Sequence, residues 1–148
     1  MSDRIVTVSA TIPAPPETLF EILATPRRHA EIDGSGTVQG TTSGPERLSL
    51  GSTFGMSMRR VAPYRITSKV VEFEEGRRIA WRPSEQGKKQ PGHLWRWELE
   101  PIDDGRTRVT HTYDWTELTD QNRVKRARAT TSERLQASID RLKDVAES

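Results

Sequence analysis

Three histidines and a few other polar residues are the side chains in this sequence that could carry chemistry. Those that strand alternation points inward, or that stand near a loop, are His29, Asp33, Tyr64, His93, His111 and Tyr113. His111 and Tyr113 are two apart, so on a strand they would share a face, separated by roughly 7 Å. A histidine base and a tyrosine donor could abstract a proton next to a carbonyl and hold the developing enolate. We take His111 and Tyr113 as candidate catalytic residues; a hydrogen-bonded core histidine is the alternative.

The other two histidines are expected in supporting positions. His29 falls in a predicted short helix, and we expect it on the helix surface near the entrance of a pocket. His93 falls at the start of a predicted strand. The three histidines are far apart and form no closely spaced pair, so no metal site is expected.

Several other kinds of chemistry are excluded by residue type or spacing. The sequence has no cysteine, which rules out disulfides, thiolate ligands and a cysteine nucleophile. The cluster Gly34, Gly36 and Gly40 misses the dinucleotide-binding pattern, because Gln39 stands where the third glycine belongs. No serine lies in a GxSxG elbow. We therefore expect no cofactor.

Composition narrows the classes of partner and the location. The chain of 148 residues predicts one domain spanning residues 1–148. Lysine and arginine number 23 against 21 acidic residues, a formal charge of +2, so no nucleic-acid partner is expected. No apolar run approaches the roughly 18 residues of a membrane span, so stable membrane insertion is not expected. Without cysteine or a leader-like start, a cytoplasmic location is the expectation.

The first third of the chain predicts one strand, two short helices and a loop. Residues 4–12 alternate apolar and polar side chains, as a half-buried strand does. Pro15 and Pro16 suit the start of a helix through residue 23, and a second helical piece is predicted over residues 27–32. Residues 33–45 contain four glycines among Ser and Thr, which indicates a loop or a poorly formed strand at a pocket entrance.

The middle of the chain predicts an antiparallel meander. Strand patterns cover residues 53–60, 64–74, 77–82, 93–100 and 107–115. Glu75-Gly76 and Asp103-Asp104-Gly105 between them have the composition of hairpin turns. The sheet is thus expected to have about six or seven strands.

Residues 120–147 contain no glycine or proline and are predicted to form one long helix with Thr119 as its N-cap. Its first turns carry Arg123, Lys125, Arg126 and Arg128. Cations at a helix start oppose the helix dipole. This basic start therefore indicates either an anionic partner or a solvated face offset by nearby carboxylates.

These elements predict an α+β helix-grip fold, in which a curved antiparallel sheet wraps around the long C-terminal helix. The sheet face toward the helix would carry all four tryptophans, opposite the small residues Ala127 and Thr131. Large rings opposite small side chains leave a cavity, unless the rings simply fill the core. The candidate ligand-binding residues are Phe54, Met56, Met58, Trp81, Trp95, Trp97, Trp115, Ala127 and Thr131.

The segments Val8–Phe20, Trp95–Pro101 and Thr107–Thr110, together with the terminal helix, resemble the START-like (SRPBCC, helix-grip) superfamily of polyketide cyclases, dehydrases and lipid-transport proteins. The resemblance covers essentially the whole chain. It implies a ligand held between the long helix and the curled sheet, but no catalytic signature carries over.

Together, the residues and the resemblance predict binding, with possible transport, of a hydrophobic or aromatic small molecule or lipid by a monomer or homodimer. Two alternatives stay open: a cofactor-independent cyclase or dehydrase using the same cavity, and a protein-interaction module without a ligand.

Overall fold

The computed structural model describes residues 4–33, 37–59, 62–85 and 88–147. Along the chain lie β1 (Ile5–Ile12), α1 (Pro16–Leu23), the 3-10 helix η1 (Pro26–Arg28), α2 (His29–Ile32), β2 (Val38–Ser43), β3 (Thr53–Arg59), β4 (Pro63–Glu74), β5 (Arg78–Glu85), β6 (Leu94–Asp103), β7 (Arg106–Asp114), α3 (Gln121–Arg128) and α4 (Ser132–Glu147). Glycines 34 and 36 of the predicted entrance loop lie outside the described residues.

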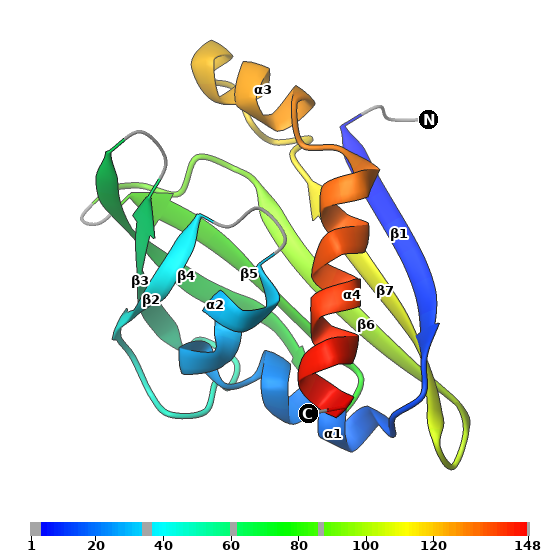
Figure 1. Cartoon of the computed structure of the whole chain (residues 1–148). Helices are drawn as coiled ribbons and strands as arrows, with labels where there is room; N and C mark the ends of the chain where they lie inside the picture. Colours follow the sequence, from blue (N-terminus) through cyan, green and yellow to red (C-terminus); the bar gives the residue numbers. More distant parts are fainter. Residues whose placement is uncertain (1–3, 34–36, 60–61, 86–87, 148) are drawn as a thin grey trace.

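The seven strands form one antiparallel sheet in the order β1-β7-β6-β5-β4-β3-β2. The sheet curves, and α1, α2 and α4 lie against its concave face (Figure 1). The predicted α+β helix-grip fold with a curved sheet and two short helices after the first strand is confirmed. The glycine-rich segment after α2 includes an irregular strand, β2, whose pairing with β3 shifts register twice.

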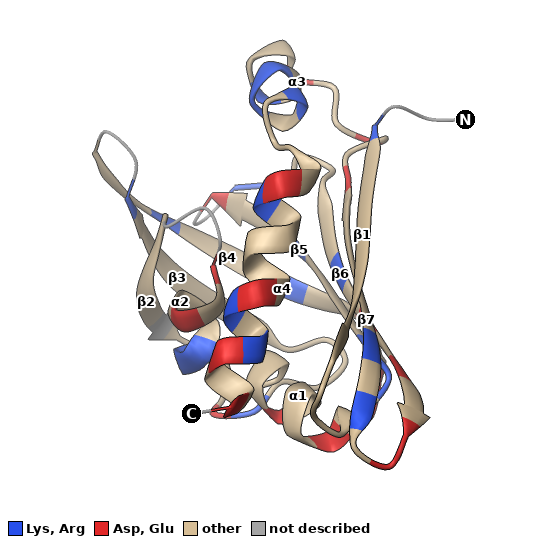
Figure 2. Cartoon of the chain, turned by 45° about the vertical axis from the view of Figure 1, so that its right-hand side comes forward, with Lys and Arg blue, Asp and Glu red and all other residues tan. Residues whose placement is uncertain are grey.

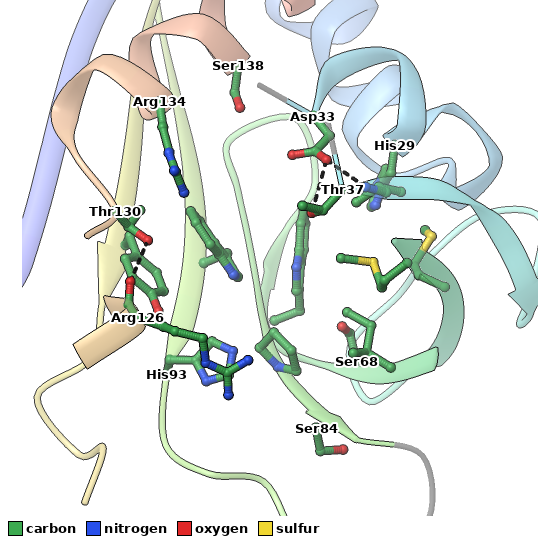
Figure 3. Close-up of a pocket in the computed structure, with 18 of the residues that line it drawn as sticks. His29, Asp33, Thr37, Ser68, Ser84, His93, Arg126, Thr130, Arg134 and Ser138 are labelled. Carbon is green, nitrogen blue, oxygen red and sulfur yellow. Dashed lines mark hydrogen bonds between the residues drawn. The ribbon is translucent and has the colours of Figure 1, made fainter. Parts of the chain in front are cut away.

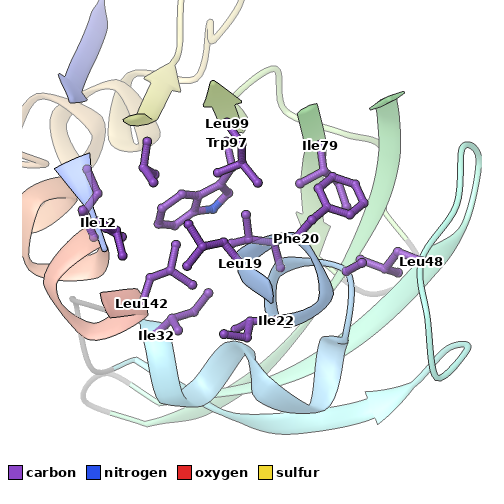
Figure 4. Packing of buried hydrophobic residues seen from close by; sticks show 14 of the residues in the cluster. Ile12, Leu19, Phe20, Ile22, Ile32, Leu48, Ile79, Trp97, Leu99 and Leu142 are labelled. Atoms are coloured by element: carbon purple, nitrogen blue, oxygen red, sulfur yellow. The ribbon is translucent and has the colours of Figure 1, made fainter. Parts of the chain in front are cut away.

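One end of the concave face is closely packed. Pro16 begins α1 without losing a helical hydrogen bond, because a backbone N–H has no intrahelical partner at this position. Leu19, Phe20 and Leu23 then point into the core. Figure 4 shows this packing, in which Leu19 lies among Ile12, Leu142 and Trp97. This end of the sheet is filled by apolar side chains of the protein.

The C-terminal segment is two helices rather than the one long helix predicted. α3 ends at Arg128, and backbone bonds from Ala129 to Arg126 and from Thr130 to Ala127 close it with tighter turns. α4 begins after Thr131, whose carbonyl accepts from the N–H of Arg134. Consecutive Thr and Ser side chains compete with helical hydrogen bonding, which explains a break without glycine or proline.

The two-helix arrangement corrects two further expectations. The N-cap of α3 is Asp120, not Thr119, because the Asp120 carboxylate accepts from the N–H groups of Asn122 and Arg123 at 2.9 and 3.2 Å. Lys125, Arg126 and Arg128 lie in the last turn of α3. Cations there favour the helix dipole rather than oppose it, so the basic segment needs no partner to offset a dipole cost.

Gly92, just before β6, lies in close contact with the backbone of Glu117. It has φ +120°, and a Cβ placed on it would lie 2.6 Å from the carbonyl oxygen of Glu117. We expect Gly92→Ala to lower the free energy of unfolding by about 2 to 4 kcal/mol, through backbone strain and the clash.

Gly76→Ala is the matched control for this prediction. Gly76 also has positive φ, +76°, but nothing lies within 4 Å of a Cβ there. It should cost only about 1 kcal/mol. Urea denaturation compares the two variants, and equal losses would contradict the close approach of Gly92 to Glu117.

Candidate functional site

A cavity of about 900 Å³ lies between the concave face of the sheet and the helices. Strands β3 to β7 supply one wall, α2 and the start of β2 another, and α3, the α3–α4 connection and the first half of α4 the rim. Figure 3 shows side chains from these elements converging on the space. The cavity adjoins the packed end but is not filled by it.

The floor of the cavity carries a row of rings in contact, here called the aromatic ladder: His93, which meets Tyr113 edge-on, and the stacked rings of Tyr113, Trp95, His111 and Trp97. Strand register creates it, because Trp95 pairs with Tyr113 and Trp97 with His111 across β6 and β7. The rings of Trp95 and Tyr113 stack with centroids 4.1 Å apart, and those of Trp97 and His111 with centroids 3.7 Å apart. The ladder thus lines the cavity with paired aromatic rings.

A second ring cluster, formed by His29 of α2, Trp81 of β5 and Phe54 of β3, lines another part of the cavity. His29 stacks on Trp81 with a centroid distance of 5.0 Å and meets Phe54 edge-on at 5.4 Å. His29 is 7% exposed, and its Nε2 donates to the carbonyl oxygen of Leu23 at 2.8 Å. The expectation of a helix-surface position for His29 is therefore wrong. The turn through Pro26 carries the ring inward, where stacking on Trp81 covers it.

His111 has a defined tautomer. Its Nδ1 donates to the carbonyl oxygen of Arg96 at 3.0 Å, since a carbonyl can only accept, and Nε2 keeps its lone pair. Burial lowers the pKa of His111 from its ordinary 6.5 to about 4, although the Arg96 carbonyl acts in the opposite direction. The ring is neutral at pH 7 and lines the cavity as a hydrogen-bond acceptor.

His93 lies immediately before β6, one residue outside the strand in which it was predicted, and beside the basic residues of α3. Its pKa is lowered to about 4 by burial first and then by the positive charges of Arg123, Arg126 and Arg82. Burial likewise lowers the pKa of His29 to about 4. All three histidines are therefore uncharged at neutral pH and add no positive charge to the cavity.

The structure brings most of the sequence-predicted ligand residues together. The residues that line the cavity are Phe54, Met56, Met58, Trp81, Trp95, Trp97, His111 and Tyr113. Asp33 and Tyr64 line it too, at the side of α2 and at the end of β4.

Three of the predicted residues lie elsewhere. Trp115 and Ala127 are buried in a separate cluster with Leu118, Val124 and Leu135, and Thr131 is exposed and absent from the lining. The helix break explains the difference, because α3 turns Ala127 onto Trp115 rather than onto the tryptophans of β5 and β6. Trp115 is also covered by Arg4 and Arg128, whose guanidinium carbons lie 4.9 and 5.2 Å from its ring centroid.

Sequence reasoning missed the polar residues of the rim and wall. Arg126 and Arg134 line the cavity, and so do Ser68 and Ser138. Ser68 could have been found from its place in the alternation of β4, and Arg134 from the helix start that Thr130, Thr131 and Ser132 indicate. Across the described residues, no group of His, Asp or Glu side chains could hold a metal ion, and no helix could cross a membrane.

A curved antiparallel sheet with a helix across its concave face defines the class of helix-grip domains. Residues 3–147 match the family described as polyketide cyclase / dehydrase and lipid transport, and the chain belongs to that family.

The chain is also similar to individual curated proteins. The chain is 43% identical over 112 residues to an uncharacterized protein of Mycobacterium tuberculosis, a match that covers 74% of this chain. The match covers only 47% of that relative, so the chain spans about half the length of the curated relatives it matches.

Two solved structures have the same fold at low sequence identity. The Zhui aromatase/cyclase from a Streptomyces species is 19% identical, with a TM-score of 0.73 over 97% of this chain and 93% of that one. The Aha1 dimer from Colwellia psychrerythraea is also 19% identical, with a TM-score of 0.64 over 97% and 96% of the two chains.

The histidine pKa values predict a pH dependence of stability. Unfolded rings bind protons below about pH 6.5, whereas the folded rings bind them only near pH 4. The free energy of unfolding should therefore decrease as pH falls from 6.5 to 4, by up to about 1.4 kcal/mol per pH unit for each ring.

NMR titration of the three histidine rings tests this directly, with the urea-unfolded chain as control. The unfolded rings should titrate near pH 6.5, and the folded rings well below pH 5. A folded midpoint near 6.5 for His111 would show that its ring is not buried as described.

Proposed function

We propose that this chain binds a hydrophobic or aromatic small molecule or lipid in the cavity between the curved sheet and α4. The observation that supports this most strongly is the size of the cavity together with its lining. Protein interiors leave few voids larger than a water molecule, whereas pockets for small molecules span roughly 300 to 1,000 Å³. A space of about 900 Å³ faced by the aromatic ladder, Trp81 and two methionines suits a planar apolar ligand.

The number of rings in the lining supports an aromatic ligand in particular. His29 with Trp81 and the aromatic ladder bring two clusters of rings to the cavity. Offset stacking and edge-to-face contacts add to the free energy gained by removing apolar surface from water. The methionines of β3, Met56 and Met58, are flexible enough to adapt to ligands of different outline.

A cyclase or dehydrase activity is the second candidate, and one observation favours it: His111 lines the cavity with a free Nε2 lone pair. The buried hydroxyl-bearing ring of Tyr113 lies two residues away on the same strand. A base works best with a pKa near the operating pH, so a pKa of about 4 makes His111 weak for proton abstraction at pH 7. Binding without turnover is therefore the function we favour.

A ring introduced on the cavity side of β4 tests the binding site. Ser68 is 1% exposed, lines the cavity and pairs with Phe54 across the sheet. Ser68→Phe should weaken binding of the neutral apolar probe pyrenebutanol more than about tenfold, because the new ring occupies ligand volume. Quenching of the protein's tryptophan fluorescence measures the dissociation constant.

Thr67→Phe is the control, because the adjacent residue of β4 points to the other face of the sheet and does not line the cavity. It should leave the affinity unchanged. Circular dichroism confirms that both variants fold. Equal affinity of Ser68→Phe and the unaltered chain would place the probe elsewhere and contradict the proposed function.

Turnover is tested separately by mass spectrometry of a bound aromatic polyketide after long incubation. We expect recovery of the unchanged compound. Loss of water or ring closure that disappears in His111→Gln would favour the enzyme instead.

A further inference from the structure

The side chains that line the cavity carry more positive than negative charge. Four arginines line it, Arg65, Arg123, Arg126 and Arg134, against two carboxylates, Asp33 and Glu85. The lining histidines are neutral at pH 7 and add nothing to this sum. The apolar cavity therefore opens through a rim with excess positive charge.

The two carboxylates already have partners. Glu85 accepts from Arg123 at 2.9 Å and pairs with Lys88 at 2.9 Å. Asp33 accepts from the backbone N–H of Val38 at 2.8 Å, on the side of the cavity formed by α2. Neither carboxylate neutralises the remaining arginines of α3 and α4.

Three of the four arginines, Arg65, Arg126 and Arg134, have no ion pair or hydrogen bond from the guanidinium to another residue in the described part of the chain. Arg65 lies on β4, whereas Arg126 and Arg134 lie on α3 and α4. In Figure 3, Arg126 lies beside His93, and Arg134 extends from the first turn of α4 toward the interior of the cavity. Figure 2 shows the basic side of α3 next to the start of α4.

The helix break places both side chains at this rim. In one continuous helix, positions 126 and 134 would be eight residues apart, about 12 Å along the axis. The turn at Ala129 to Thr131 instead brings the end of α3 and the beginning of α4 to the same opening. The N-terminus of α4 adds the positive end of a helix dipole there.

We propose that the ligand is amphipathic and carries an oxyanion, a carboxylate or a phosphate, that Arg126 and Arg134 hold at the rim while its apolar part lies against the aromatic ladder. This inference rests on the proposed function and names the chemical class of its ligand. Guanidinium groups form paired, charge-assisted hydrogen bonds to both oxyanions. A neutral apolar compound would enter the same cavity but gain nothing from the rim.

Three probes that share one ring system test the inference: pyrenebutanol, pyrenebutanoic acid and pyrenebutyl phosphate. At low ionic strength and pH 7, the two anions should bind about fivefold to tenfold more tightly than the alcohol. Salt near 1 M, which shortens the screening length to about 3 Å, should shrink this difference. The carboxylate and phosphate arms separate the two possible oxyanions.

The double variant Arg126→Gln and Arg134→Gln should abolish the preference for the anions and leave the affinity for pyrenebutanol within about twofold. The matched control, Lys125→Gln with Arg141→Gln, removes the same charge from the same helices at exposed positions that do not line the cavity. The control should keep the preference.

The outcomes separate the two proposals. Binding of all three probes with equal affinity, blocked by Ser68→Phe, would overturn the oxyanion site and leave the proposed function standing. An anion preference lost equally in the control would assign it to net charge and also overturn the site. Failure of every probe to bind would overturn the proposed function and this inference with it.

Discussion

The concave face of the sheet is larger than the helices that cover it, and the rest of the structure depends on this mismatch. α4 has sixteen residues, about 24 Å of helix, and packs mainly against β1, β7, α1 and α2. Leu135, Ile139 and Leu142 cover that part of the sheet. The concave sides of β3, β4 and β5 receive no comparable cover from α4, and the cavity occupies the space above them. Because the helix breaks after Arg128, α4 is shorter than the predicted helix and covers less of the concave face.

The distribution of charge follows from the same geometry. An unpaired ion in the apolar interior would cost several kcal/mol, and the interior accordingly holds neutral histidines and a defined His111 tautomer. Among the described residues, the guanidinium groups that line the cavity belong to exposed or half-buried arginines, which water still reaches. The positive field of Arg123 and Arg126 at His93 helps keep this ring uncharged. An apolar interior below a positive rim is the arrangement that would favour an amphipathic anion.

The strands and their inward faces could be predicted because alternation has only two faces to choose between, and this is why eight of the predicted site residues line one cavity. The helix break could not be found by looking for glycine or proline. Thr130, Thr131, Ser132 and Glu133 have the S/T-x-x-E spacing typical of a helix start, a signal outweighed by the continuous helical pattern around it. The predicted position of Ala127 and Thr131 opposite the tryptophans is wrong because of this helix break. The position of His29 depends on a turn at Pro26 and on a partner, Trp81, more than fifty residues away, which no local pattern encodes.

The most direct test of the account is a solution NMR titration of methyl-labelled methionine with pyrenebutanoic acid. Met56 and Met58 line the same cavity as the aromatic ladder, so ring currents from a bound probe should shift both methyl signals, with Overhauser contacts from the probe to Trp81 and Trp95. Saturable shifts of both methyls would establish the cavity as the ligand site. Unshifted methyl signals at saturating probe, with contacts only to exposed side chains such as Leu50 and Ile102, would contradict it.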